Sequence, residues 1–272
     1  MKTRILASVI LLPLLLAVVL FLPKICTAVL IGLMAAIAAY ELLYGTGYVK
    51  HPRLVAYAAV MALLLALWSN LGMGYAWALL GVLAFTVLMF AEIMVSGMKL
   101  PYEKVVVCFA AGILVPFLLT ALVRLHTMEQ GRAYILIPFL LAFVSDSGAY
   151  FAGRFLGKHK LAPVISPKKT VEGAIGGILA AMLGMVIYCL VVQLAFDFQV
   201  NYLYALIYGA VGSVAAVFGD LCFSVIKRQT GIKDYGNLIP GHGGILDRFD
   251  SMVIVAPLTE LLMIFIPVAV KL

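Results

Sequence analysis

The sequence has few charged residues for its length. Of 272 residues, 19 are Lys or Arg and 12 are Asp or Glu, whereas 65% are hydrophobic and the mean hydropathy is +1.16. A soluble domain would be about half apolar, and runs of about twenty apolar residues indicate transmembrane helices. Continuous apolar runs also argue against a transmembrane β-barrel, whose strands alternate polar and apolar residues. The composition therefore predicts an all-α, polytopic integral membrane protein.

Cysteine motifs, repeats and linkers are also absent. Cys26, Cys108, Cys189 and Cys222 stand singly in apolar segments without C-x-x-C or Cys/His spacing, so we interpret them as packing residues. No low-complexity tract or soluble domain interrupts the chain, which predicts a single transmembrane domain over residues 1–272. The basic N-terminus and its apolar run resemble a secretory signal, but no A-x-A-like site follows. We therefore expect an uncleaved first span.

Hydropathy predicts about nine transmembrane helices, although a count of eight or ten remains open. The apolar segments are Ile5–Leu22, Ile25–Tyr44, Leu54–Ser69, Tyr75–Ser96, Lys104–Leu125, Tyr134–Phe151, Gly173–Phe196, Leu203–Ile226 and Met252–Val270.

Basic residues divide unequally between the two sides that nine spans would create. The side that carries the N-terminus collects 15 of the 19 Lys and Arg residues, and the other side has Lys24, Arg124, Arg132 and Lys271. The positive-inside rule then predicts a cytoplasmic N-terminus and an outside C-terminus. Because the positive charge is dispersed among loops, we expect no nucleic-acid partner. Both long polar segments, Gly153–Glu172 and Lys227–Ser251, fall on the cytoplasmic side.

The segment Ser224–Asp250 concentrates charge in this apolar chain. It reads S-V-I-K-R-Q-T-G-I-K-D-Y-G-N-L-I-P-G-H-G-G-I-L-D-R-F-D, with seven charged residues and five glycines among 27. Carboxylates can hold a divalent cation, while Lys, Arg and backbone N–H groups near glycine can hold phosphate. A helix that begins at Ile245 would add free N–H donors at its N-terminus. The alternative is a solvated loop, but Asp220, an acid inside the preceding membrane segment, argues for a functional cluster.

A second polar cluster begins at Asp146, inside the apolar segment before residues 153–172. We expect Asp146 to face the same polar cavity as Asp220. The alternative is a buried structural carboxylate that is hydrogen-bonded by a Tyr or Ser on a neighbouring helix. The run S-P-K-K-T-V-E-G that follows reads as a helix start, with Ser166 as cap and Pro167 at the first position. Lys168 and Lys169 beside such a helix start would bind phosphate, although positive-inside anchoring explains them as well.

Other membrane acids and glycines have less definite roles. Glu41, Glu92 and Glu260 are either contacts between helices or secondary parts of the cavity, and the sequence does not decide. The glycine pairs around Gly176 and Gly209 predict close helix packing.

These residues resemble the signature of the phosphatidate cytidylyltransferases, also called CDP-diacylglycerol synthases. The resemblance runs from Ser224 to Asp250 through S-x-x-K-R-x-x-x-x-K-D, P-G-H-G-G and D-R-x-D, and S-D-S-G-A-Y and S-P-K-K-T-x-E-G are also similar to family motifs. It covers the C-terminal half strongly and residues 1–130 only by hydropathy. It implies a catalytic half at 131–272, with 1–130 serving as scaffold and lipid access.

The resemblance implies a Mg²⁺-dependent transfer of the cytidylyl group from CTP to phosphatidate, which gives CDP-diacylglycerol and pyrophosphate. Asp220 and Asp247 would be the principal metal ligands, with K⁺ as an optional second cation, and Asp146 and Asp250 would support them. Lys227 and Arg248 complete the expected catalytic group. The expected substrate-binding residues are Ser224, Arg228, Lys233, His242, Gly243, Gly244, Lys168 and Lys169.

The same resemblance implies membrane lipid as a partner, a bacterial-type inner membrane as the location, and an active site on the cytoplasmic side. A homodimer is an open alternative to a monomer. The nearest rival function is a CTP-dependent polyprenol or phytol kinase, which is similar in its C-terminal motif but releases CDP. A cation-coupled transporter that uses Asp146 and Asp220 is a rival from another class.

Overall fold

A computed structural model of the chain describes residues 13–271. Within this range, seven helical stretches are long and apolar enough to cross a membrane: Lys24–Gly45, Pro52–Leu71, Tyr75–Val95, Tyr102–Thr127, Gly131–Leu156, Val171–Phe196 and Tyr202–Gln229. They match the second to eighth predicted segments to within a few residues. The protein is therefore a predominantly helical, polytopic membrane protein, as the composition predicts.

The first and last predicted segments differ from the other seven. Residues 5–12 of the segment Ile5–Leu22 lie outside the described residues, and residues 13–21 are helical. In the last segment the helix α13 covers only Met252–Phe265, 14 residues with Pro257 inside. At 1.5 Å per residue such a helix extends about 21 Å, less than the roughly 30 Å of a bilayer core.

The chain forms two compact units, and the last polar segment belongs with the N-terminal helices. The first unit contains residues up to Thr127 together with Gln229–Phe249, and the second contains Met128–Arg228 with Asp250–Leu272. Elements of the first are α2 (Lys24–Tyr40), the π-helical turn η1 (Glu41–Gly45), α3 (Pro52–Leu71), α4 (Tyr75–Val95), α5 (Tyr102–Phe109), the π-helical turn η2 (Ala110–Leu114), α6 (Val115–Leu119), α7 (Ala121–Thr127) and α12 (Leu246–Phe249). Elements of the second are α8 (Gly131–Tyr134), α9 (Leu136–Leu156), β1 (Lys160–Ala162), β2 (Ser166–Thr170), α10 (Val171–Phe196), β3 (Phe198–Val200), α11 (Tyr202–Gln229), α13 and β4 (Ala269–Lys271).

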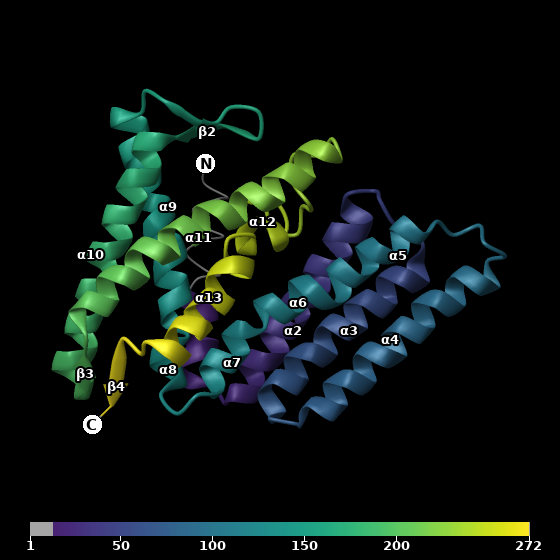
Figure 1. Cartoon of the computed structure of the whole chain (residues 1–272), viewed down its shortest axis with the longest axis horizontal. Helices are drawn as coiled ribbons and strands as arrows, with labels where there is room; N and C mark the ends of the chain where they lie inside the picture. The colour runs from purple at the N-terminus through teal and green to yellow at the C-terminus, as the bar shows by residue number, and fades with distance from the viewer. Residues whose placement is uncertain (1–12, 272) are drawn as a thin grey trace. The chain divides into compact units, whose positions relative to one another are not determined.

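Small residues let helices approach closely inside each unit, as the glycine pairs predict. In the first unit α2 packs on α3, where a Cβ at Gly32 would lie 2.7 Å from the Leu63 side chain. In the second, α9 and α10 run side by side (Figure 1), and a Cβ at Gly177 would lie 2.9 Å from the carbonyl oxygen of Ser145. A Cβ at Gly209 on α11 would overlap the backbone of Met182 on α10. Such contacts exclude larger residues and pack apolar helices without a hydrophobic driving force.

Two small antiparallel sheets were not expected from the sequence. In one, β1 pairs with β2, so the segment between α9 and α10 is a hairpin. In the other, β3 pairs with β4 in the register Phe198↔Lys271 to Val200↔Ala269. The second sheet joins the end of α10 to the residues after α13.

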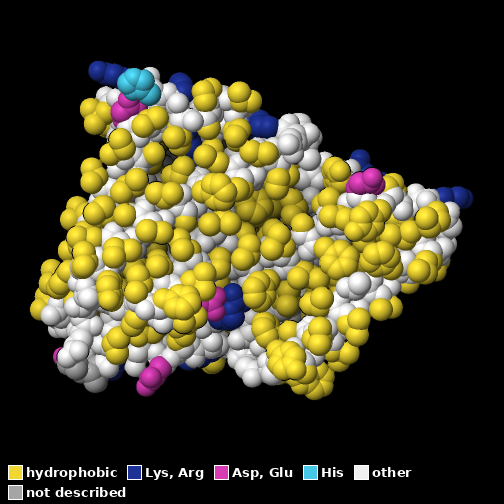
Figure 2. Space-filling model, viewed as in Figure 1, with side chains coloured by type: hydrophobic (Ala, Val, Ile, Leu, Met, Phe, Trp, Pro, Cys, Tyr) yellow, Lys and Arg dark blue, Asp and Glu magenta, His cyan; other side chains and the backbone are white. Residues whose placement is uncertain are grey.

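Apolar side chains cover most of the surface shown in Figure 2. Two helices illustrate this with exposed residues at helical spacing: Leu79, Leu80, Leu83 and Val87 on α4, and Ile175, Leu179, Leu183 and Ile187 on α10. In water such faces would be unfavourable, but lipid tails solvate them. The exposed faces agree with the membrane assignment.

Candidate active site

A cavity of about 390 Å³ in the second unit contains both acids that the sequence predicts to share one. Asp146 on α9 and Asp220 on α11 line it, and the basic side chains of Arg154, Lys168 and Lys169 line it too. Tyr150 lies one helical turn from both Asp146 and Arg154, and its hydroxyl accepts a hydrogen bond from the Arg154 guanidinium at 2.9 Å. The lining thus combines oxygen ligands for a cation with donors for phosphate.

The lysines reach this cavity from a strand, and the expectation of a helix start at Ser166 is wrong. Residues 166–170 form β2, and α10 begins only at Val171, where Thr170 is the N-cap and its Oγ1 accepts from Gly173 N at 3.1 Å. Lys169 Nζ lies 2.5 Å from Asp220 Oδ2, with 22% and 30% of the two side chains exposed. The ion pair therefore holds a base and an acid together at the cavity.

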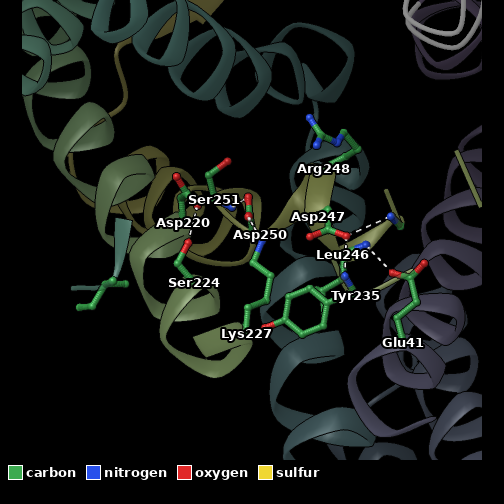
Figure 3. Close-up of polar contacts among 12 residues, drawn as sticks. Glu41, Asp220, Ser224, Lys227, Tyr235, Leu246, Asp247, Arg248, Asp250 and Ser251 are labelled. Atoms are coloured by element: carbon green, nitrogen blue, oxygen red, sulfur yellow. Dashed lines mark hydrogen bonds and ion pairs between the residues drawn. The ribbon is translucent and has the colours of Figure 1, made fainter. Parts of the chain in front are cut away.

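Asp220 and the following residues share one face of α11, as their spacing predicts. Ser224 Oγ donates to Asp220 Oδ1 at 3.2 Å, and Lys227 Nζ lies 4.0 Å from Asp250 Oδ2 (Figure 3). Asp250 precedes α13 in a turn, and its Oδ1 accepts from Ser251 N at 2.8 Å. Burial raises the pKa of Asp250, and the neighbouring Asp220 carboxylate raises it further, while Lys227 opposes both.

The turn at Asp250 comes close to α11 because α11 carries a glycine there. A Cβ at Gly219 would lie 3.1 Å from the Asp250 carbonyl oxygen and 3.0 Å from Ser251 Cα. Arg228, at the end of α11, points elsewhere: its Nε donates to the Ile165 carbonyl oxygen at 3.1 Å, next to the hairpin.

The first unit has its own polar cavity, of about 420 Å³, around the P-G-H-G-G turn. Lys233, His242, Gly243 and Arg248 line it, together with Asp234 and Asn237. The turn is closed by its backbone: His242 N donates to Ile239 O and Ile239 N donates to Gly243 O, both at 2.9 Å. Arg248 Nε donates to the His242 carbonyl oxygen at 2.9 Å. These contacts fix the conformation of the turn from within the chain.

The one-turn helix α12 begins near the predicted position, but its N-terminal donors are already bonded within the chain. Asp247 Oδ2 accepts from Tyr235 N at 2.7 Å and from Gly244 N at 3.0 Å. The Glu41 carboxylate accepts from Ile245 N at 3.0 Å and from Leu246 N at 2.7 Å. The expectation that this helix start offers free N–H groups to a phosphate is therefore wrong.

The acids of the second unit are carboxylates, the kind of ligand that divalent cations use. Mg²⁺ is usually bound by one or two carboxylates, with phosphate oxygens and water completing the shell. Asp146 and Asp220 line one cavity, and burial, with repulsion from Asp220 and Asp146 added to it, raises the pKa of Asp250. Among residues 13–271, no three His, Cys, Asp or Glu side chains form a group that could hold a metal ion. A cation at these carboxylates would therefore need further ligands, such as phosphate oxygens and water.

The structure distributes the predicted site residues over both units. Asp146, Lys168, Lys169, Asp220, Ser224, Lys227, Arg228 and Asp250 belong to the second unit, and Lys233, His242, Gly243, Gly244, Asp247 and Arg248 belong to the first. Their roles as ligands and substrate contacts stay predictions.

Three residues at or near these cavities were given no definite site role from the sequence. Arg154 lies eight residues after Asp146, a helical spacing that could have placed it on the same face. Glu172 anchors the hairpin: its carboxylate accepts from Lys158 N at 3.0 Å and lies 2.6 Å from His159 Nδ1. The third, Glu41, had no local signal that connected it to the distant α12.

Comparison with known proteins identifies the family of this chain. The sequence model of the cytidylyltransferase family matches residues 2–266, so the chain belongs to that family. Proteins named phosphatidate cytidylyltransferase from Staphylococcus epidermidis, Staphylococcus saprophyticus and Staphylococcus aureus are 48%, 47% and 45% identical to it over 139 residues. Each match covers 51% of this chain and 52% of the relative. The chain thus spans about half the length of the curated relatives it matches.

Proposed function

We propose that this protein transfers the cytidylyl group of CTP to phosphatidate, producing CDP-diacylglycerol and pyrophosphate. The observation that carries the proposal is the cavity in which Asp146 and Asp220 meet Lys168, Lys169 and Arg154. Membership of the cytidylyltransferase family and the names of its relatives supply the reaction class. Both substrates bear phosphate, and the cavity has the donors that phosphate needs.

In the proposed reaction, a phosphatidate phosphate oxygen forms a bond to the α-phosphorus of CTP. The bond from that phosphorus to the β-phosphate oxygen breaks, and its electron pair leaves with pyrophosphate. No general base is required, since a phosphate monoester is largely ionised near neutral pH. Lys168, Lys169 and Arg154 would neutralise the phosphate charge and orient the reacting groups.

The acids would supply the cation site. Asp220 and Asp247 are the proposed principal ligands of Mg²⁺, and Asp146 and Asp250 support them. Bound Mg²⁺, with K⁺ as a second cation, would stabilise the charge on the phosphates. Lys169 pairs with Asp220 at 2.5 Å and compensates its charge in this partly buried place, so a bound cation would have to compete with Lys169 for this carboxylate.

We also propose nine membrane spans, with the N-terminus in the cytoplasm and the C-terminus outside. The distribution of Lys and Arg over the loops supports this orientation. It places the hairpin and residues 227–251 on the cytoplasmic side, where CTP is available, while phosphatidate keeps its acyl chains in the bilayer.

The test uses purified protein with Mg²⁺, CTP labelled at either the α- or the γ-phosphate, and either phosphatidate or a polyprenol alcohol as the acceptor. A cytidylyltransferase moves the α-label into the lipid fraction and releases the γ-label as pyrophosphate. Movement of the γ-label into lipid would identify a kinase instead, and no labelled lipid would refute both. Reactions without phosphatidate, or with EDTA followed by excess Mg²⁺, are the controls for substrate and metal dependence.

A further inference from the structure

Glu41 is a buried acid whose hydrogen-bond partners lie more than two hundred residues away in the sequence. It belongs to η1 at the end of α2, and only 3% of it is exposed. Its two carboxylate oxygens accept separately: Oε1 accepts from Ile245 N, and Oε2 accepts from Leu246 N, as Figure 3 shows. A buried carboxylate is costly unless it is bonded, so this pair of N–H donors explains how Glu41 can be there.

The chain around Glu41 is built for close approach. A Cβ at Gly236 would lie 2.6 Å from Glu41 Oε1, and a Cβ at Gly244 would overlap the same carboxylate. On the other side, a Cβ at Gly45 would overlap the Tyr235 carbonyl oxygen. The α-helix changes to a π-helical turn here, with Thr46 N donating to Glu41 O at 3.2 Å, and such turns are frequent at functional sites.

The partners of Glu41 adjoin the acid that the proposed reaction requires. Leu246 precedes Asp247, and Asp247 Oδ2 is held by Tyr235 N and Gly244 N. A shift of the Ile245–Leu246 backbone would therefore move Asp247 with it. We propose that Glu41 is a positioning residue, which anchors the start of α12 and so sets the place of the Asp247 carboxylate.

This inference rests on the proposed function only where it gives Asp247 a metal-binding role. It assigns residues 1–130 a part in the site beyond scaffold and lipid access. The partners that orient metal ligands are sensitive positions, and their mutation costs about 10- to 100-fold in metal affinity or activity.

The test compares Glu41→Gln with the matched control Glu92→Gln. A glutamine keeps one acceptor oxygen but presents an NH₂ group to the second N–H, so one of the two bonds is lost. Glu92 is also a membrane-segment glutamate, but it accepts from Tyr57 Oη at 3.1 Å and lies 3.8 Å from Arg53 Nη1, all within the α3–α4 pair. Hydrogen–deuterium exchange of peptides from 235–249 and the Mg²⁺ concentration for half-maximal activity are measured for each variant.

For Glu41→Gln we expect faster amide exchange in 235–249, a half-activating Mg²⁺ concentration raised about tenfold and a lower kcat. Excess Mg²⁺ should restore part of the rate, and Glu92→Gln should match the unaltered protein in both measurements. Unchanged exchange would overturn the anchoring role. Faster exchange with unchanged Mg²⁺ activation and kcat would reduce Glu41 to a structural residue and overturn the proposal.

A second variant covers the case in which Glu41→Gln does not fold. Glu41→Asp keeps the charge but withdraws the carboxylate by one methylene, and we expect the same two changes at smaller size. If the unaltered protein makes no CDP-diacylglycerol, the proposed function fails. In that case hydrogen–deuterium exchange alone tests whether Glu41 anchors α12. The effect on Asp247 is tested by calorimetric measurement of Mg²⁺ binding to the unaltered, Glu41→Gln and Glu92→Gln proteins. Equal Mg²⁺ affinity of the three proteins would overturn the proposal.

Discussion

Asp247 has a structural role, shown by its hydrogen bonds, and a proposed role as a metal ligand, and two substitutions distinguish them. Its carboxylate is buried, with 7% of the residue exposed, and Oδ2 accepts from Tyr235 N at 2.7 Å and Gly244 N at 3.0 Å. Asn can place its amide oxygen where Oδ2 lies and keep both bonds, but it carries no charge. Ala removes the acceptor and leaves two buried N–H groups without this partner.

The structure gives different magnitudes for the two variants. Each buried donor left unsatisfied costs about 1–3 kcal/mol, so Asp247→Ala should lower the free energy of unfolding by about 2–6 kcal/mol. For Asp247→Asn the weaker neutral hydrogen bonds are offset by the removal of a buried charge, and we expect a change within about 1 kcal/mol. Turnover should nevertheless fall about 100-fold or more in Asp247→Asn, because a neutral amide cannot replace an anionic metal ligand.

The assay combines thermal unfolding of the purified variants in detergent with CDP-diacylglycerol formation at saturating Mg²⁺. Near-normal turnover in Asp247→Asn would refute the assignment of Asp247 as a ligand. Equal thermal stability of the Ala and Asn variants would refute the structural role of the two hydrogen bonds.

Three further predictions follow from single residues. Thr170→Ala removes the N-cap acceptor of α10 and should lower the free energy of unfolding by about 1 kcal/mol in thermal unfolding, whereas Thr170→Ser should not. Gly243 and Gly231 have positive φ values of 88° and 73°, so an alanine at either position should strain the backbone by about 1–2 kcal/mol. Because the added methyl would lie 2.8 Å from a carboxylate oxygen only at Gly243, that variant alone should lose most turnover in the assay. Asp250 has a raised pKa, so its protonated form stabilises the folded protein fully below about pH 4, and this contribution is lost as the pH rises through the raised pKa. In EDTA the melting temperature should therefore fall over this pH range, and Asp250→Asn should make the fall smaller.

The long helices could be predicted from the sequence because hydropathy and length decide them. The hairpin could not. The run S-P-K-K-T has a capping residue and a proline at the first position, a pattern typical of a helix start, but pairing of β2 with β1 overrides it. The helix begins after Thr170 instead, whose side chain supplies the cap. The sequence pattern thus correctly indicates a capped helix start, but the capping residue lies four positions later than predicted.

Some features of the candidate site could also be predicted from the sequence, and others could not. Helical spacing was enough to expect Asp220, Ser224 and Lys227 on one face, and the hydrogen bond from Ser224 to Asp220 confirms this for the first two. The cavity shared by Asp146 and Asp220 was expected as well. The contact of Glu41 with Leu246 spans 205 residues, and no periodicity within either segment indicates it.

Several backbone N–H groups in and after the P-G-H-G-G turn form hydrogen bonds within the protein and are therefore not free to bind a ligand. Backbone donors of this region are bonded within the chain, at His242 to Ile239, at Gly244 to Asp247, and from Ile245 and Leu246 to Glu41. A phosphate group would have to displace carboxylates that are already buried to use them, which would leave two acids without compensation. The N–H groups of Gly244, Ile245 and Leu246 are thus poor candidates for anion binding, whereas Lys233 and Arg248 place cationic side chains on the cavity lining.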